Sequence, residues 1–206
     1  MRVKLLLASS NEGKLREYRA LAAEHPEIAI DLLPGFHEFP VFSEDAPTFA
    51  ENAAGKVLHY SRFADEIVFA DDSGLVVAAL HGAPGVRSAR YAGENANDAQ
   101  RNAKLLTEMH EKSGDARDAK FVCVIAAARQ GKMLAVVSDS VEGGIANEPH
   151  GANGFGYDPL FYFAPRKKTF AELSEVEKNR LSHRGKAFRR LGEALTSLKT
   201  ANASRT

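Results

Sequence analysis

Two adjacent carboxylates follow a short apolar run. Asp71 and Asp72 come directly after residues 67–70 and are followed by Ser73 and a glycine. Neighbouring carboxylates repel each other, and a hard cation relieves that repulsion. Because successive side chains of an extended chain point to opposite faces, one carboxylate suffices for a metal, while the other caps a turn or pairs with a base. A solvated turn is the alternative, since Asp, Ser and Gly are common turn formers.

Further polar residues lie upstream of this pair. Glu44 is the natural second metal ligand, and Asp45 is the alternative. On the helix predicted to begin at Thr48, Asn52 and Lys56 share one face. Taken alone, Lys56 is either a ligand contact or, more commonly, a solvated charge.

A polar segment near the N-terminus is suited to an anion. It lies between an apolar run and a helical pattern, where free backbone N–H groups and the helix dipole favour negative charge. A lysine adds charge and a glycine permits close approach. Because the P-loop pattern is incomplete, a simple helix-capping turn is an equal alternative. The residues are Ser9, Ser10, Asn11, Glu12, Gly13 and Lys14.

A glycine-flanked aromatic ring and a basic cluster occur later in the chain. Phe155, between Gly154 and Gly156, is either a base-stacking platform or a tight turn whose ring packs in the core. Around Ser182, which can cap a helix, three side chains offer hydrogen-bond donors to an anion or a carbonyl, unless they form an exposed basic turn. These three are Lys178, His183 and Arg184.

The elements that must position these residues alternate between strands and helices. This order predicts an α/β fold with a mixed sheet covered on both sides, and a single domain over residues 1–199 followed by a frayed tail at 200–206. The acidic pair is then expected at a strand end. Strands are predicted at 3–8, 28–33, 67–70, 119–129, 132–140 and 160–163, with a hairpin turn at 130–131 and a basic turn at 166–168, and helices around 15–22, from 48, at 97–112, near 172–178 and after 182.

Composition restricts the class of protein. The chain of 206 residues carries 27 Lys and Arg and 27 Asp and Glu, so it has no net charge with which to attract nucleic acid or an anionic membrane. No run is apolar for long enough to suggest a membrane span or a signal peptide. The single cysteine, Cys123, excludes an internal disulfide and favours a reducing compartment such as the cytoplasm. We expect its thiol to be buried and inert.

In combination, six segments resemble the inosine triphosphate pyrophosphatase family, whose members remove deaminated purine nucleotides. The resemblance spans nearly the whole chain, and six motifs in the right order are specific where each alone is weak. The segments are residues 9–14, 48–53 with Lys56, 70–75, 84–91, 154–159 and 182–185.

The resemblance implies an elongated mixed sheet flanked by helices, with two lobes around a central nucleotide-binding cleft. It also implies a homodimer in the cytoplasm, Mg²⁺ as cofactor, and cleavage of ITP, dITP and XTP to the monophosphate and pyrophosphate. By position, Glu44 and Asp72 would hold the metal, with Asp72 as proton acceptor. Residues 9–14 and Lys56 would hold the phosphates, and the remaining substrate contacts would be Ser73, Phe155, Gly156, Tyr157, Asp158, Lys178, His183 and Arg184.

Specificity is expected to depend on the purine 6-position, where hypoxanthine and xanthine carry a carbonyl acceptor and adenine an amino donor. Arg184 and His183 are suitable donors for that carbonyl. Separately, the sequence departs from the family pattern at two positions, with Ala46 instead of glycine and Ser9 instead of threonine. The rival functions are a pyrophosphatase for pyrimidine or modified nucleotides and a nucleotide-sensing protein without turnover. A nucleic-acid-binding module is a poorer rival because the basic residues are scattered.

Overall fold

The computed structural model describes residues 3–25 and 27–203 and groups the chain into two compact units. Unit 1 comprises Met1–Asp72, Cys123–Asp139 and Arg184–Thr206, and unit 2 comprises Ser73–Val122 and Ser140–His183. We describe each unit by itself. Within the described ranges, no helix is long and apolar enough to cross a membrane.

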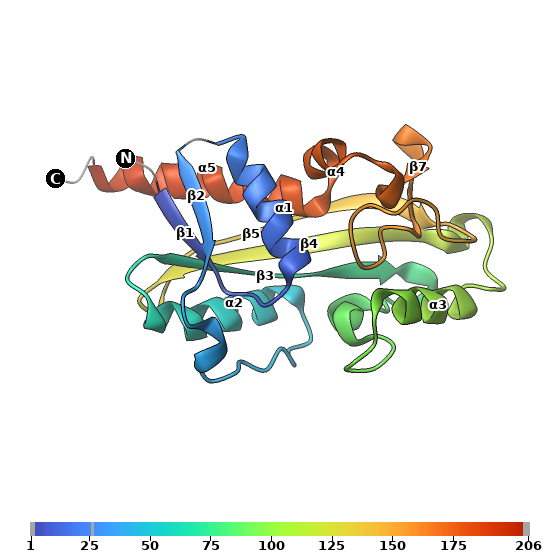
Figure 1. Ribbon diagram of the computed structural model, residues 1–206, viewed down its shortest axis with the longest axis horizontal. Coiled ribbons are helices and arrows are strands. Elements are labelled where there is room, and N and C mark those ends of the chain that lie inside the picture. Colours follow the sequence, from blue (N-terminus) through green and yellow to red (C-terminus); the bar gives the residue numbers. More distant parts are fainter. Residues whose placement is uncertain (1–2, 26, 204–206) are drawn as a thin grey trace. The chain divides into compact units, whose positions relative to one another are not determined.

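The strands form a mixed seven-stranded sheet in the order β2-β1-β3-β4-β5-β6-β7 (Figure 1). Strand β1 pairs in parallel with β2 and β3, whereas β6 is antiparallel to both β5 and β7, which confirms the predicted mixed α/β fold. The strands are β1 (Val3–Leu7), β2 (Ile28–Leu32), β3 (Ile67–Val77), β4 (Asp118–Arg129), β5 (Lys132–Ile145), β6 (Phe161–Phe163) and β7 (Lys168–Thr169). The α-helices are α1 (Glu12–Ala23), α2 (Phe49–Tyr60), α3 (Asp98–Glu108), α4 (Glu175–Leu181) and α5 (His183–Ala203).

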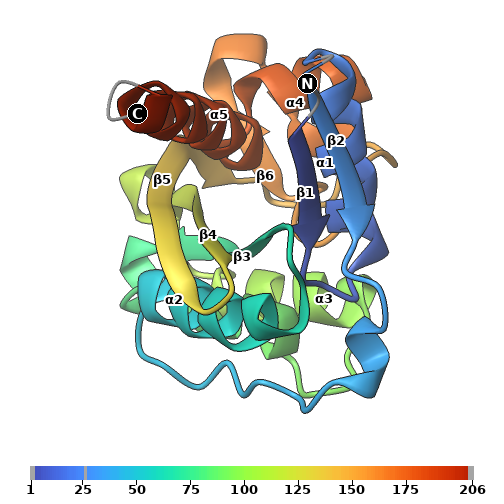
Figure 2. The same cartoon turned by 90° about the vertical axis from the view of Figure 1, so that its left-hand side faces the viewer.

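Unit 1 buries both faces of its strands. Leu5 and Leu7 of β1 pack in one cluster with Tyr18 of α1 and Phe188 of α5. Leu6, on the opposite face, is also buried, and Figure 2 shows α2 and α5 on opposite sides of the strands. A parallel strand covered on both faces is apolar at successive positions, which explains the uninterrupted leucine run.

Unit 2 has its own hydrophobic core. Leu105 of α3 and Met109, which caps the C-terminus of that helix, belong to one cluster with the rings of Tyr157, Phe161 and Phe170. Tyr157 anchors the loop at residues 151–159 in this cluster. Helix α3 is capped at its N-terminus by Asn97, whose side chain forms a reciprocal capping box with Gln100.

The expectation that Asp71 and Asp72 lie at a strand end is wrong. Strand β3 runs without interruption from Ile67 to Val77, so both carboxylates lie in mid-strand and are buried. The strand continues because each carboxylate has charged or polar partners, so neither needs a turn to reach water. The alternation of an extended chain then sends the two side chains to opposite faces, as expected.

Several element boundaries also differ from prediction. Strand β5 runs past residue 140 through Gly143, where a Cβ would lie 2.6 Å from the Tyr162 carbonyl oxygen, so this glycine permits close strand packing and makes no turn. The basic segment at 166–168 leads directly into β7, which was not predicted. Helix α3 ends four residues early, at Glu108, and α5 continues to Ala203, so residues 200–203 are helical where a frayed tail was expected. Residues 204–206 lie outside the described residues.

Candidate active site

Helix α2 positions two polar side chains one turn apart. The Thr48 hydroxyl caps the helix by accepting a hydrogen bond from the Glu51 amide at 3.2 Å, as the sequence predicts. Asn52 and Lys56 follow on one face, and both are buried. Residues four apart on a helix are neighbours in space, so the two side chains leave α2 on the same side.

The partners of Asn52 and Lys56 are the two predicted metal ligands. Asn52 Nδ2 donates to Asp72 Oδ2 at 2.9 Å, and Lys56 Nζ donates to Glu44 Oε1 at 2.7 Å. The negative charge of Glu44 also acts on Asp72, where it raises the pKa. The structure therefore brings Glu44 and Asp72 together on one side of α2.

Asn52 also fixes the loop that carries Glu44. Its Oδ1 accepts the Ala46 amide at 2.9 Å, and its Nδ2 donates to the Ala46 carbonyl at 3.3 Å. Both contacts involve only main-chain atoms of residue 46, so the alanine at this position is compatible with the loop geometry. Sequence reasoning placed Asn52 on the correct face and assigned it no role.

The environment of Asp72 favours proton uptake. Burial raises the pKa of this carboxyl to about 6, against the hydrogen bond from Asn52 and the charge of Lys14, and the charges of Glu44 and Asp71 contribute to the rise. A carboxylate with a pKa near neutrality can accept a proton and still be ionised at physiological pH. Crowded negative charge is also what a divalent cation would relieve.

Asp71 faces a different set of partners. Lys14 Nζ lies 2.9 Å from its Oδ1 and 3.2 Å from its carbonyl oxygen, and Arg184 Nε lies 3.4 Å from its Oδ2. Burial alone would raise the pKa of Asp71, but the Lys14 and Arg184 cations hold it well below its ordinary value. Asp71 therefore pairs with bases, which is one of the two roles that the sequence left open.

Arg184 lies in a buried ion-pair cluster of unit 1. Its guanidinium contacts Glu17 through Nη1 and Asp71 through Nε and Nη2. Both Arg184 and Glu17 are almost fully buried. Sequence reasoning missed Glu17, which lies beside the apolar stripe of α1 and is separated from Arg184 by 167 positions.

The N-terminal segment forms the predicted loop and helix start. The Asn11 side chain caps α1 by accepting the Lys14 amide at 2.9 Å, and the Ser9 hydroxyl accepts the Asn11 amide at 3.1 Å. Ser10 and Glu12 are exposed. Lys14 extends from the first turn of α1 to Asp71, so the segment and the carboxylates belong to one cluster within unit 1.

Unit 2 holds the predicted base-binding loop. Asp158 Oδ2 accepts the Phe155 amide at 2.8 Å and forms a buried ion pair with Lys178. Lys178 Nζ lies 5.0 Å from the centroid of the half-buried Phe155 ring. The structure thus brings together three of the residues that were assigned to base binding.

Other predicted contacts lie deeper in the fold. The Tyr157 ring is buried in the core of unit 2, and its hydroxyl donates to the Ser88 carbonyl at 2.9 Å. The buried His183 ring stacks on Phe121 with 4.7 Å between centroids. Ser73 is half-buried in β3.

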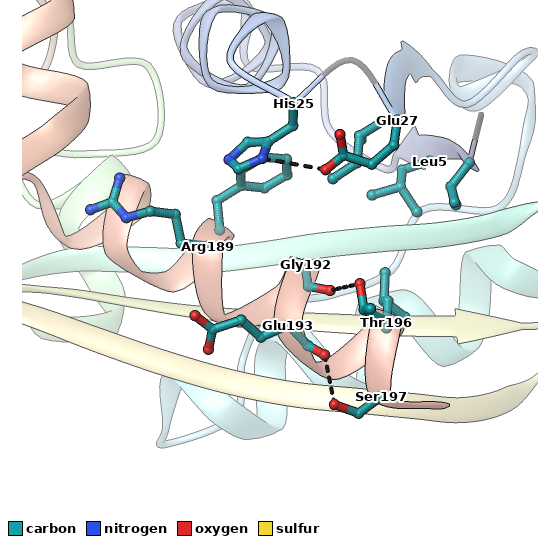
Figure 3. A pocket seen from close by; sticks show the side chains of 12 residues that line it. Leu5, His25, Glu27, Arg189, Gly192, Glu193, Thr196 and Ser197 are labelled. Carbon is teal, nitrogen blue, oxygen red and sulfur yellow. Dashed lines mark hydrogen bonds and ion pairs between the residues drawn. The ribbon is translucent and has the colours of Figure 1, made fainter. Parts of the chain in front are cut away.

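A pocket of about 510 Å³ lies elsewhere in unit 1 (Figure 3). Apolar side chains such as Leu5 line it, and His25, Glu27 and Gly192 also contribute. None of its lining residues was predicted as a site residue. Half of its lining residues are polar or charged, but none belongs to the carboxylate cluster or to the loop of unit 2.

Known proteins of similar sequence and structure belong to one family. The model of the Ham1 family matches residues 5–194. A dITP/XTP pyrophosphatase of Geobacillus kaustophilus is 48% identical over 190 residues, which cover 92% of this chain and 93% of that protein. A Desulforamulus reducens protein of the same name is 46% identical over 198 residues, covering 95% and 97%. The structure of a Ham1 protein from Coxiella burnetii aligns with a TM-score of 0.83 and 41% identity, covering 95% of this chain and 99% of that one. The chain belongs to the Ham1 family.

Proposed function

We propose that this protein hydrolyses deaminated purine nucleoside triphosphates, namely ITP, dITP and XTP, to the monophosphate and pyrophosphate. The observation that carries the proposal is the pairing of Glu44 and Asp72 by successive turns of α2, with Lys14 and Lys56 in the same cluster. This set can bind a metal and a polyphosphate. Similarity to dITP/XTP pyrophosphatases over nine-tenths of the chain supports the choice of substrate.

The proposal includes Mg²⁺, and the donor set fits this ion. Mg²⁺ is usually bound by one or two protein carboxylates together with substrate phosphates and water. Glu44 and Asp72, which lie together on one side of α2, would be the two carboxylates. When bound, the ion would neutralise charge on the phosphates.

Hydrolysis requires that water attack the α-phosphorus while the bond to the bridging oxygen breaks and pyrophosphate leaves. Asp72, held in place by the Asn52 amide, accepts the proton of the attacking water. Lys14 and Lys56 supply positive charge for the phosphate oxygens as negative charge shifts to the leaving group. The N-terminus of α1 adds backbone donors beside Lys14.

We assign base recognition to the loop of unit 2. The Phe155 ring offers a stacking surface, and Lys178 offers an N–H donor beside it. A donor-lined site accepts the 6-carbonyl of hypoxanthine or xanthine and disfavours the 6-amino group of adenine. The sequence led us to expect Arg184 as a base donor; because its guanidinium binds Glu17 and Asp71, we assign it instead to holding Asp71 in place.

The test is the release of pyrophosphate from a panel of ITP, dITP, XTP, GTP, ATP and pyrimidine triphosphates, with and without Mg²⁺. We expect Mg²⁺-dependent release that is strongest for the deaminated purines. Preference for a pyrimidine, or binding of ITP without turnover, would overturn the proposal. By family likeness we also propose a homodimer in the cytoplasm; light scattering and cell fractionation test these two points.

A further inference from the structure

The loop of unit 2 holds Phe155 between two glycines in the left-handed region. Gly154 has φ +76° and Gly156 has φ +63°. A Cβ at Gly154 would lie 2.1 Å from Asp158 Oδ2, so no side chain fits there. The loop therefore needs hydrogen bonds to its main chain to keep one conformation.

One side of Phe155 is fixed by the loop's own carboxylate. Asp158 Oδ2 accepts the Phe155 amide and also pairs with Lys178. These contacts fix the backbone before the ring. The backbone after the Phe155 ring is held by other residues.

Helix α3 fixes the backbone after Phe155 by binding both main-chain polar groups of Gly156. The Gly156 amide donates to Asp98 Oδ2 at 2.6 Å, and Asn102 Nδ2 donates to the Gly156 carbonyl at 3.0 Å. Asp98 and Asn102 are four residues apart on α3, so they present one face to the loop. Arg101 holds the second oxygen of Asp98.

Asn102 is a poor choice for stability alone. Its side chain is 7% exposed, and its Oδ1 has no hydrogen-bond partner in the part of the chain that the structure describes. A buried acceptor without a donor costs free energy that an apolar residue of similar size would avoid. The hydrogen bond to Gly156 is what the Asn102 amide contributes in return for this cost.

We propose that Asp98 and Asn102 are positioning residues that set the orientation of the Phe155 ring, and through it the affinity for the purine base. The inference rests on the proposed function, because it takes the base as the ligand of this loop. Neither residue contacts the phosphates in this assignment. Their loss should weaken base binding and leave the phosphate and metal site unchanged.

The experiment measures inhibition of ITP hydrolysis by the two products separately. IMP carries the base, whereas pyrophosphate reports on the metal and phosphate site. For Asp98→Ala and Asn102→Ala we expect the inhibition constant of IMP and the KM for ITP to rise about tenfold, as for loss of one hydrogen-bonded contact, with kcat and the constant for pyrophosphate nearly unchanged. Thr107→Ala, at an exposed position of α3, is the control and should change neither constant.

Conservative variants separate positioning from general stability. Asp98→Asn keeps an acceptor for the Gly156 amide and should restore IMP affinity. Asn102→Asp removes the donor and places a carboxylate against the Gly156 carbonyl oxygen, so it should not restore IMP affinity. Asn102→Leu fills the same space without a donor; it should fold at least as well as Asn102→Ala and still bind IMP weakly.

Unchanged IMP inhibition in a folded Asn102→Leu or Asp98→Ala protein would overturn the inference. A parallel loss of IMP and pyrophosphate affinity would do so too, because it would indicate a general structural defect. A wild-type protein that neither hydrolyses ITP nor binds IMP would overturn the proposed function, and the inference with it.

Discussion

Two adjacent carboxylates in one strand have opposite electrostatic environments. The Lys14 and Arg184 cations hold the pKa of buried Asp71 well below its ordinary value, whereas burial raises the pKa of Asp72 to about 6. Asp71 is thus a permanent counter-ion and Asp72 a group that can exchange a proton. The charge of Asp71 should therefore stabilise the fold, whereas the charge of Asp72 should be needed for turnover.

The two isosteric substitutions test this division. Asp72→Asn should reduce pyrophosphate release on the order of a thousandfold, because it removes the proton acceptor. It should not lower the unfolding midpoint, because burial already disfavours the charged carboxylate. Asp71→Asn should lower the free energy of unfolding by about 3 kcal/mol, because it leaves buried cations undercompensated. Urea unfolding and pyrophosphate release measure the two effects. Near-normal turnover by folded Asp72→Asn would remove Asp72 from the mechanism.

The single cysteine should be unreactive in the folded protein. Burial raises the pKa of the Cys123 thiol to about 12, and the charge of Asp71 adds to this rise. At pH 8 the thiol is therefore neutral and inaccessible, whereas a free thiolate is the reactive species. An aromatic disulfide reagent should label no cysteine before unfolding and one afterwards. Rapid labelling of the native protein would contradict the buried position.

At the scale of elements, the site depends on how α2 packs against the loop that carries Glu44. A Cβ at Gly55 of α2 would lie 2.5 Å from Phe42 Cζ. We expect Gly55→Ala to displace the Phe42 ring and, with it, the nearby Glu44. The Mg²⁺ concentration for half-maximal activity should then rise severalfold.

The matched control is Gly192→Ala in α5. There the nearest atom to an added Cβ is Ile28 Cδ1 at 3.9 Å, and the position lines the pocket of unit 1 (Figure 3). Alanine should stabilise the helix by about 0.5–1 kcal/mol without changing the Mg²⁺ requirement. An equal response of both variants to Mg²⁺ would show that Phe42 does not transmit the change.

Elements with local signals could be predicted from the sequence. Thr48 and Glu51 form the cap that predicts the start of α2. Gln130 and Gly131 form the predicted turn, with φ of 50° and 73°. The sequence predicts an end of β3 at residue 70 because Asp71 and Asp72 are typical turn residues, and this is wrong because both have buried partners. Only the tertiary structure reveals those partners.

The supporting residues of the site had no local signal. Asn102 meets Gly156 across 54 positions, and Glu17 meets Arg184 across 167. A polar residue on an otherwise ordinary helix does not identify its partner by periodicity or composition. Motif likeness therefore located the residues expected to touch substrate, and packing was needed to find those that hold them.

For the whole molecule, neutrality predicts weak binding to nucleic acid. Equal numbers of acidic and basic residues provide little affinity from counterion release. Fluorescence anisotropy with labelled duplex DNA should show no saturable binding at physiological salt. Tight binding that weakens steeply with added salt would instead support the nucleic-acid rival.

Asn52 has a consequence for mutational tolerance. Its amide serves the Ala46 amide, the Ala46 carbonyl and Asp72 at once, and the side chain is completely enclosed. Aspartate lacks the donors, and glutamine is longer by a methylene group. Saturation mutagenesis should therefore find this neutral position as restrictive as the charged ones, although no chemical step is assigned to it.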